Sequence, residues 1–370
     1  MAFSIFDCYS RLDRESKENN FLLQLKTACM KYSNNKIVSV VVVNWNGKQH
    51  LKDCFSSLLK QTSPRLEIIM VDNASNDGSV NFMKENFPEV KLIQNNTNIG
   101  FGPAVNRGIA ESESEYLIFL NNDLSLEPDC ISELLKSLEK PNVGGAIPKI
   151  LMHGEKDKIN SFGVDVNYVG IACPRYIYEK DSDSLKEEEV PCGGIFIVHR
   201  DLVEKLEGFD ESIFFYHEDH DLSWRLRLLG MKLIVNPKAV IYHKYHFSRH
   251  KDKFYYSEKN RLYLLLKNYS LKTLMLIFPA ILLVEIAELY FALAQGWFVK
   301  KIKSYFELLI MSPTIIKKRI AIQSKRAVKD REIVRILTGR LVVGGIKNPL
   351  LENILSPVIN LYWKLIKEFV

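Results

Sequence analysis

Residues 38–123 alternate short apolar runs with helical patterns, and this alternation constrains the fold more than any other feature of the chain. The apolar runs are Val38–Val43, Leu66–Val71, Val90–Gln94 and Leu117–Leu120. Apolar residues recur at helical spacing in the segments between them, and the loops are short. Strands and helices in this order are typical of an α/β fold with a mostly parallel, doubly wound sheet.

Polar side chains follow two of these runs at the point where each run ends. Asp72 follows the second run, and Asn121-Asn122-Asp123 follows the fourth. Ligands of open α/β sheets bind just outside the carboxyl ends of the strands. Asp123 could therefore hold a hard divalent cation that in turn holds a diphosphate. Asp72 could accept a hydrogen bond from a nucleobase or a ribose hydroxyl, or it could cap the next helix.

Three further segments carry candidate chemistry. The glycines of Asn98–Gly102 could let a phosphate approach a helix N-terminus, although the loop lacks a full nucleotide-binding fingerprint. Glu218–Asp221 opens a helix with three acids, one of which could act as a general base while the others orient an acceptor or pair with Arg225. His243 ends the last expected strand and could be a metal ligand or a structural residue.

The segments after residue 123 extend this domain. We expect a polar hairpin insertion with a solvated loop over Gly154–Glu189. Two short strands, Met231–Val235 and Ala239–His243, are expected to close the domain. The expected organisation is an N-terminal peripheral helical extension over 1–36, the α/β domain over 37–268 and a basic helical region over 269–370.

The C-terminal region has a membrane-like composition. Thr273–Val299 carries only two charged side chains, Glu285 and Glu288, and roughly 20 apolar residues suffice for a span. Because Pro279 interrupts the segment and both acids fall on one helical face, an interfacial or re-entrant helix pair is favoured over a single span. The aromatic residues Phe291, Trp297 and Phe298 would then lie at headgroup depth, and Lys300, Lys301 and Lys303 would contact lipid phosphates. The alternative is a helical subdomain packed on the α/β domain.

Charge and cysteine usage point to the cytosolic face of a membrane. The net charge of +6 comes with basic residues crowded in the C-terminal third, which suits an anionic membrane surface. No motif combines aromatic and basic residues as nucleic-acid binders do, so no nucleic-acid partner is expected. The six cysteines show no framework spacing, which favours reduced thiols, and the polar N-terminus does not resemble a signal peptide.

Taken in order, the motifs resemble those of a family 2 glycosyltransferase, in particular its rhamnosyltransferase-like branch. The resemblance covers about 38–268, and the motifs that carry it are Asn44-Trp45-Asn46-Gly47, Asp72-Asn73-Ala74-Ser75, Asn98–Phe101, Leu120–Asp123, Pro148–Ile150, Cys192-Gly193-Gly194, Glu218–Arg225 and His243. It implies a GT-A fold, an inverting mechanism, a nucleotide-diphosphate sugar donor and a divalent cation, Mg or Mn. The acceptor would be a lipid-linked molecule or a glycan.

The resemblance also implies roles for individual residues. Asp219 would be the catalytic base, with Glu218 beside it. Asp123 would be a metal ligand, and His243 would be a metal ligand or a contact to the diphosphate. The donor would be bound by Asn44, Asp72, Asn98, Gly100, Asn121, Asn122 and Lys149. The acceptor would be bound by Gly193, Gly194, Asp221, Trp224 and Arg225. The chain departs from the family pattern at Asn121, where many relatives have Asp, so the metal site loses one charge.

Two other functions compete with this interpretation. A nucleotidyltransferase on a similar sheet would need a basic, glycine-rich loop after the first strand, and Asn44–Lys48 offers little of one. A non-catalytic sugar- or lipid-binding module would be favoured by the loss of Asp123 or Asp219, and both are present.

Overall fold

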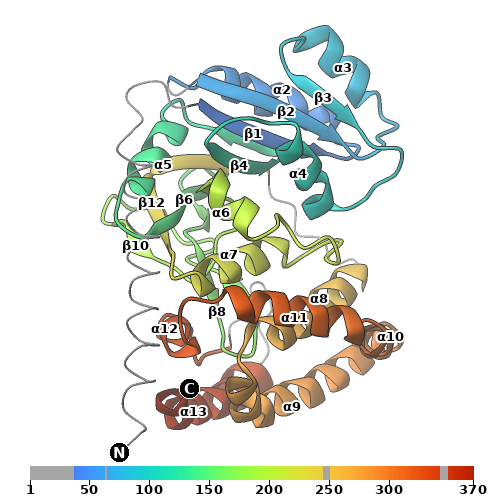
Figure 1. Ribbon diagram of the computed structural model, residues 1–370, viewed down its shortest axis with the longest axis vertical. Helices are drawn as coiled ribbons and strands as arrows, with labels where there is room; N and C mark the ends of the chain where they lie inside the picture. The colour runs from blue at the N-terminus through green and yellow to red at the C-terminus, as the bar shows by residue number, and fades with distance from the viewer. Residues whose placement is uncertain (1–36, 63–64, 245–250, 342–348) are drawn as a thin grey trace, which may run out of the picture.

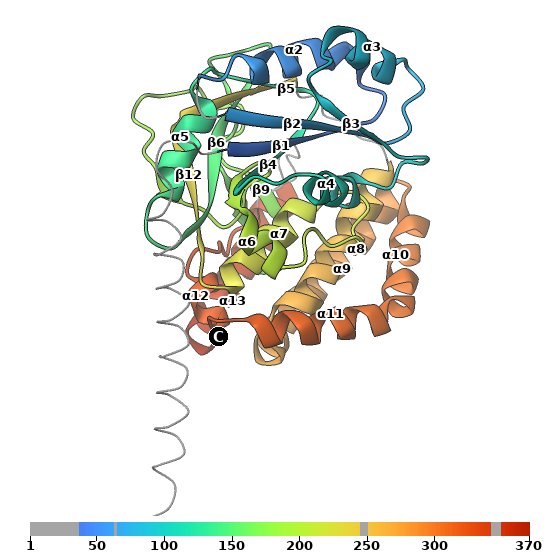
Figure 2. The same ribbon diagram turned by 45° about the horizontal axis from the view of Figure 1, so that its top comes forward.

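The computed structural model describes residues 37–62, 65–244, 251–341 and 349–370 (Figure 1). The expected N-terminal extension over 1–36 lies outside these residues, as do the histidines at 246 and 250. An α/β part with a large sheet lies above a layer of C-terminal helices, and both views show the two parts in contact (Figures 1 and 2).

The sheet has ten strands and confirms the mostly parallel, doubly wound architecture. Its main path runs in the order β10-β12-β6-β11-β4-β1-β2-β3, with β5 and β7 paired to β12 and β6. The antiparallel β11 separates the parallel strands β4 and β6. The strands are β1 (Ile37–Asn44), β2 (Arg65–Asp72), β3 (Lys91–Gln94), β4 (Tyr116–Asn121), β5 (Leu124–Leu126), β6 (Val143–Met152), β7 (Ile159–Ser161), β10 (Glu188–Glu189), β11 (Ile197–His199) and β12 (Lys232–His243). A separate hairpin pairs β8 (Val164–Val166) with β9 (Ala172–Pro174).

Helices cover both faces of the sheet, because the buried strands are apolar on both faces. Alternate valines of β1 enter different cores: Val38, Val40 and Val42 pack on one side, and Val41 and Val43 on the other. The helices α2 (Lys48–Leu59), α3 (Ser79–Asn86) and α5 (Cys130–Leu138) contribute to the first core. The helices α4 (Phe101–Ala110), α6 (Arg200–Lys205) and α7 (Glu218–Leu228) contribute to the second.

One expectation for the α/β domain was wrong in detail. The two short strands expected near its end form one strand, β12, with a register shift between Asn236 and Val240. The Asn236 side chain stabilises this irregularity by donating to Glu133 O and Ser137 Oγ, both at 3.0 Å.

The insertion over 154–189 contains the expected hairpin, and residues 182–184 of its loop are exposed. The rest of the insertion is anchored in the protein, since Phe162 and Tyr168 are fully buried.

The C-terminal region is helical, as expected. It comprises α8 (Lys251–Asn268), α9 (Leu271–Ala294), α10 (Phe298–Ile310), α11 (Ser312–Lys325), α12 (Asp330–Val334), a π-helical turn (Leu351–Leu355), α13 (Ser356–Ile366) and a 3₁₀ turn (Lys367–Phe369). The expected interruption at Pro279 was wrong, because α9 continues through Pro279 for 24 residues. By length and composition alone α9 could cross a membrane.

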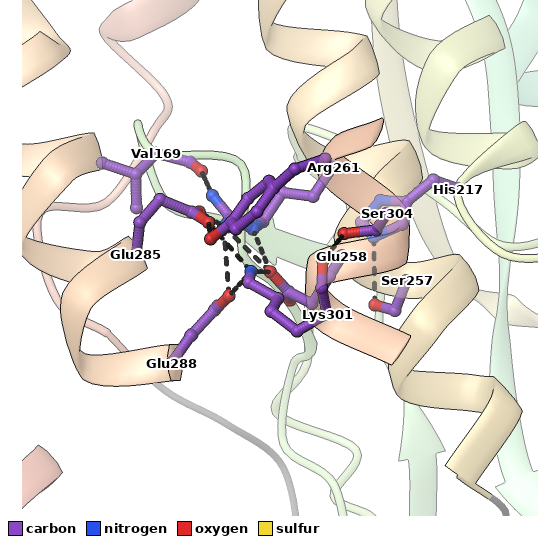
Figure 3. Close-up of polar contacts among 10 residues, drawn as sticks. Val169, His217, Ser257, Glu258, Arg261, Glu285, Glu288, Lys301 and Ser304 are labelled. Atoms are coloured by element: carbon purple, nitrogen blue, oxygen red, sulfur yellow. Dashed lines mark hydrogen bonds and ion pairs between the residues drawn. The ribbon is translucent and has the colours of Figure 1, made fainter. Parts of the chain in front are cut away.

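A buried cluster of charges joins α8, α9 and α10 (Figure 3). Lys301 of α10 lies 2.9 Å from Glu258 of α8 and 2.9 Å from Glu285 of α9. It also contacts Glu288 of α9. Arg261 of α8 contacts the same three acids and donates to Val169 O at 2.9 Å. The two acids of α9 therefore face the protein interior.

Burial and charge act against each other in this cluster. Burial, with a contribution from the neighbouring Glu258, raises the pKa of Glu288 well above its ordinary value, although Arg261 opposes the shift. Burial alone would raise the pKa values of Glu258 and Glu285 too, but Arg261 and Lys301 lower them. Two cations thus contact three acids.

This cluster corrects two expectations about the membrane. Lys301 was expected to contact lipid phosphates, but its side chain is fully buried among the three acids. Trp297 was expected at headgroup depth, but it is buried and its ring stacks on Phe254 with centroids 5.2 Å apart.

Lys301→Met should destabilise the protein strongly, because it removes one of the two cations that contact the acids Glu258, Glu285 and Glu288. Removing one partner of a buried ion pair costs about 3–5 kcal/mol. Urea unfolding followed by circular dichroism measures the change. Lys303→Met is the matched control, since the Lys303 side chain is 65% exposed on the same helix. Equal stability of the two variants would contradict the role of the cluster.

Candidate active site

The carboxyl ends of β1, β2 and β4 lie side by side and bring the first set of polar residues together. Asn44 pairs in register with Asp72, and Val43 pairs with Asn121. The Asn44 amide donates to Asp72 Oδ1 at 2.8 Å, and Asn122 Nδ2 donates to Asn44 Oδ1 at 2.5 Å. Asn44 is fully buried, so this chain of hydrogen bonds fixes a polar edge across three strands.

Asp72 does not cap the following helix. Gly78 occupies the cap position of α3, and Asp72 instead accepts hydrogen bonds from Ser75 N at 2.9 Å and from Ser75 Oγ at 2.6 Å. With the bond from Asn44, three of the roughly four acceptor positions of the carboxylate are used. The remaining position can accept a ligand N–H or hydroxyl.

Trp45 lies next to this edge and was given no role in the sequence analysis. Its side chain is 58% exposed, although it follows the fully buried Asn44 directly. An aromatic ring exposed beside this polar edge could stack on a flat ligand group such as a nucleobase. Its position after an apolar run was the signal in the sequence that could have identified it.

The loop Asn98–Gly102 is shaped by its own side chains. Asn98 Oδ1 accepts from Gly100 N at 3.0 Å, and Gly100 O accepts from Asn73 Nδ2 at 3.1 Å. Gly100 has a φ of +92°, and a Cβ there would lie 2.4 Å from Phe214 O. Glycine is required at this position because the loop and the Phe214 backbone approach so closely.

Asp123 and His243 meet although they are 120 residues apart. Asp123 Oδ2 lies 3.2 Å from His243 Nε2, and His243 Nδ1 lies 3.0 Å from Asn160 Oδ1. An amide oxygen only accepts, so His243 Nδ1 donates to Asn160 and the ring turns Nε2 toward the Asp123 carboxylate. Partners of this kind orient metal-ligating histidines, so Nε2 and the Asp123 carboxylate could together hold a cation.

The donor set fits a divalent cation. Asp123 Oδ1 is buried and has no hydrogen-bond partner among the residues that the structure describes. One carboxylate and one imidazole are ligands that manganese-like ions accept. Of the neighbouring amides, Asn122 is engaged by Asn44 and Asn121 is exposed. Asn160 was not identified from the sequence, since nothing in the polar insertion marks it.

The acidic start of α7 lies beside the glycine turn that precedes β11. A Cβ added to Gly194 would lie 3.4 Å from Asp219 Oδ2, so these two expected site residues are neighbours. At Gly193 a Cβ would lie 2.5 Å from the Ile147 side chain, so packing also requires a glycine there. The structure thus brings Asp219 together with the glycine turn.

Burial separates the protonation states of the two acids. The side chains of Glu218 and Asp219 are half-buried at the start of α7. Burial raises the pKa of Asp219 to about 6, and burial together with Asp219 raises the pKa of Glu218 to about 8. At pH 7 Asp219 is mostly ionised and Glu218 is mostly protonated, as suits a base beside a neutral neighbour.

The other residues expected on the acceptor side point into the protein. Asp221 is fully buried and bonds Arg225 Nε and Lys267 Nζ, both at 2.8 Å. Trp224 is buried between His220 and Tyr269. The structure therefore supports the alternative in which Asp221 pairs with Arg225. The side chains of Asp221, Trp224 and Arg225 are buried, so the acceptor role expected for them would require them to become exposed, and it stays a prediction.

Lys149 is also engaged within the protein. It lies on β6, is largely buried, and forms an ion pair with Asp181 of the insertion at 2.7 Å. Contact with a donor diphosphate would require this pair to open.

A cluster of three acids and a cavity lined by basic residues lie outside the site at the strand ends. Carboxylate oxygens of Glu258, Glu285 and Glu288 lie within 4.8 Å of one another, but Lys301 and Arg261 already supply the cations. A cavity of about 250 Å³ lies between residues 206–211 and α11, with Arg225, Lys267 and Lys318 among its lining residues. Lys267 and Lys318 both pair with Asp210, so the cavity has little uncompensated charge.

The comparisons with known proteins agree with this geometry. Residues 39–207 match the family described as Glycosyl transferase family 2. The N-acetylglucosaminyl-diphospho-decaprenol L-rhamnosyltransferase of Mycobacterium tuberculosis is 27% identical over 236 residues, which cover 57% of this chain and 77% of that protein. The O-antigen biosynthesis protein RfbC of Myxococcus xanthus is 26% identical over 228 residues, or 58% of this chain and 18% of that protein.

A solved structure shows the same fold. The crystal structure of GalNAc-T7 with UDP, GalNAc and Mn²⁺ superposes with a TM-score of 0.54 at 18% identity, covering 67% of this chain and 51% of that one. The chain therefore has a fold of the GT-A type. Over residues 39–207 it is similar to Glycosyl transferase family 2, and over 57% of its length it is similar to the rhamnosyltransferase from M. tuberculosis.

Proposed function

We propose that this enzyme transfers a sugar, a deoxyhexose such as rhamnose or another hexose, from a nucleotide-diphosphate donor to a hydroxyl of a lipid-linked acceptor, with inversion. The observation that carries the proposal is Asp219, a carboxylate with a raised pKa beside the Gly194 turn, in a domain whose strand ends present Asp72 and Asp123. The relative from M. tuberculosis is named for rhamnosyl transfer to a lipid-linked sugar, which supports this acceptor class. No observation favours a nucleotidyltransferase or a non-catalytic module.

The donor side binds through the polar strand edge. Asp72 would accept a hydrogen bond from the nucleoside, and Trp45 would cover the base. The loop at Asn98 and Gly100 would approach the donor through its backbone. Asp123 and His243 would hold a Mg or Mn ion, and such an ion, when bound, offsets charge developing on the leaving diphosphate.

The acceptor side supplies the base. Asp219 takes the proton of the acceptor hydroxyl while the oxygen forms its bond to the anomeric carbon. The bond from that carbon to the diphosphate oxygen breaks on the opposite side, so a single displacement inverts the centre. Glu218 is protonated at pH 7 and leaves Asp219 as the ionised carboxylate of the pair.

Asp219→Asn should lower kcat by about 10²–10⁴-fold while leaving donor affinity close to normal, because the amide is nearly isosteric but not basic. In the parent enzyme, kcat/KM should fall as the pH drops below about 6, since burial raises the pKa of Asp219 to about 6 and only the ionised form is a base. Transfer rates from pH 5 to 9 with labelled nucleotide sugars provide the measurement. A variant that keeps most of its rate would show that Asp219 is not the base.

Asn160→Leu should weaken Mn²⁺ binding by about 10–100-fold, because partners that orient a ligating histidine typically contribute this much. Titration of Mn²⁺ followed by electron paramagnetic resonance measures it without any turnover. Asn160→Asp keeps an acceptor for His243 Nδ1 and should bind at least as well as the parent. Ser161→Ala is the neighbouring control, and an unchanged affinity of Asn160→Leu would contradict the assignment of Asn160.

We further propose that the enzyme lies on the cytosolic face of a membrane, beside its acceptor. Most of the large hydrophobic side chains that are exposed in the described residues lie on the C-terminal helices. Those on α9 and α13 are Leu271, Met275, Phe278, Leu282, Leu283, Ile286, Tyr290, Leu293, Val358, Leu361 and Leu365. The α9 residues recur every three or four positions along its full length, so the exposed face is a continuous stripe.

The orientation of α9 follows from its opposite face. Glu285 and Glu288 are bonded to Arg261 and Lys301 in the protein interior, and a helix that crossed the bilayer would have to give up these contacts. The helix α13 packs beside α9, with Tyr362 Oη donating to Leu276 O at 2.7 Å. Both helices therefore suit an in-plane position at the membrane surface rather than a span.

Met275→Glu combined with Leu293→Glu should abolish flotation of the full-length protein with anionic liposomes, because both side chains are 65% exposed on the α9 stripe. High salt should weaken flotation of the parent only partly, since salt screens charges but not apolar contact. Leu59→Glu, on the exposed face of α2, is the control and should float normally. A parent protein that stays unbound at low salt would contradict membrane attachment.

A further inference from the structure

The four residues that precede the acidic start of α7 form an aromatic segment. Phe214, Phe215, Tyr216 and His217 run directly into Glu218 and Asp219. The side chains of Phe214 and Phe215 are 37% and 46% exposed, in a part of the chain where the following helix is almost entirely buried. Two adjacent exposed aromatic side chains beside the proposed base therefore offer an apolar surface to a ligand.

The backbone of this segment is held in an unfavourable conformation. Tyr216 and His217 have φ values of +65° and +71°, which residues other than glycine rarely adopt. Strained backbone of this kind persists where the surrounding structure enforces it, and it clusters at functional sites.

Contacts from α8 and from the loop Asn98–Gly102, called the donor loop below, hold the segment in this conformation. Asn260 Nδ2 donates to both Phe215 O and Tyr216 O at 2.9 Å. The His217 ring lies 3.3 Å from Ser257 Oγ and 3.1 Å from the His220 ring, and burial lowers the pKa of His217 to about 4, so the ring is neutral. On the other side, the Phe214 carbonyl packs against Gly100. The segment is thus fixed between the donor loop and the catalytic helix.

The aromatic rings of this segment contact other aromatic rings and form a continuous apolar surface. The Phe214 ring lies 5.6 Å from the Tyr256 ring of α8, and the Phe215 ring lies 4.3 Å from the Tyr216 ring. Aromatic rings present broad apolar surfaces at little cost in conformational entropy. The C–H face of a pyranose ring can pack on such a surface while its hydroxyls remain hydrogen-bonded.

We propose that Phe214, Phe215 and Tyr216 form the platform on which the sugar ring of the acceptor packs, which places its hydroxyl at Asp219. This inference rests on the proposed function. The acceptor hydroxyl must come within hydrogen-bond distance of Asp219, only four residues beyond Phe215. The platform also adjoins the donor loop at Gly100, so it lies where donor and acceptor must meet.

The test uses the full-length enzyme, a nucleotide-diphosphate L-rhamnose and two acceptors. One acceptor is an N-acetylglucosaminyl diphosphate on a long prenyl chain, and the other carries the same sugar diphosphate on a short alkyl chain. Phe215→Ala should raise KM for both acceptors by about 5–10-fold, with kcat within about twofold and unchanged donor affinity by calorimetry. Phe215→Tyr should restore the parent KM, because it keeps the ring.

Tyr178→Ala is the matched control. Tyr178 is another exposed aromatic residue, 50% exposed with a φ of +66°, but it lies in the insertion after β6. Its loss should leave both KM values unchanged.

Three outcomes would overturn the inference. A KM effect of Phe215→Ala that appears only with the long prenyl chain would show that the ring contacts lipid rather than sugar. Unchanged KM values for both acceptors would show that the aromatic residues do not bind the acceptor sugar. A parent enzyme that binds the donor but transfers to neither acceptor would overturn the proposed acceptor class, and this inference with it.

Discussion

The position of the catalytic helix depends on the buried ammonium group of Lys267. Its Nζ lies 2.8 Å from Asp221 on α7 and also contacts Asp210, which in turn is bonded to Lys318 of α11. Burial alone would raise the pKa values of both acids, but Lys267, together with Arg225 at Asp221 and Lys318 at Asp210, holds them low. This chain of charges ties α7, α8 and α11 together, so the C-terminal helices are part of what positions Asp219.

The two sides of the proposed site are built by different means. The proposed donor side is an edge of backbone-paired strands, on which Asn44 bonds both Asp72 and Asn122. The proposed acceptor side is a helix start, where contacts from α8 hold the loop that precedes Glu218 and Asp219. Asp72 accepts hydrogen bonds from Asn44 and Ser75, whereas burial raises the pKa of Asp219. Under the proposed function, the same type of side chain would serve as a fixed acceptor in one place and as a base in the other.

The sequence reveals the parts of this site that depend on local pattern. Apolar runs that end in Asp72 or in Asn121–Asp123 predict strand ends, and a run of acids at Glu218 predicts a helix start. Contacts across long stretches of chain were not predictable, because nothing near Asn160 signals its partner His243 and nothing near Lys301 signals three buried acids. The sequence likewise did not reveal which residues of the motif after Glu218 are buried. Asp219 and Asp221 are both aspartates two positions apart, yet Asp221 is fully buried against Arg225 and Asp219 is not.

The reversed direction of β11 has a consequence for how the enzyme can diversify. An antiparallel strand starts toward the edge where its parallel neighbours finish: β11 starts at Ile197 opposite Ile118 in the middle of β4, and ends at His199 opposite Tyr116, the first residue of β4. The Gly193-Gly194 turn that precedes β11 is thereby brought beside Asp219 without belonging to β1, β2 or β4. Under the proposed function, changes in this turn and in the aromatic segment would alter what meets Asp219 while the strands of the proposed donor side stay intact. Acceptor choice and donor choice would then evolve separately within one sheet.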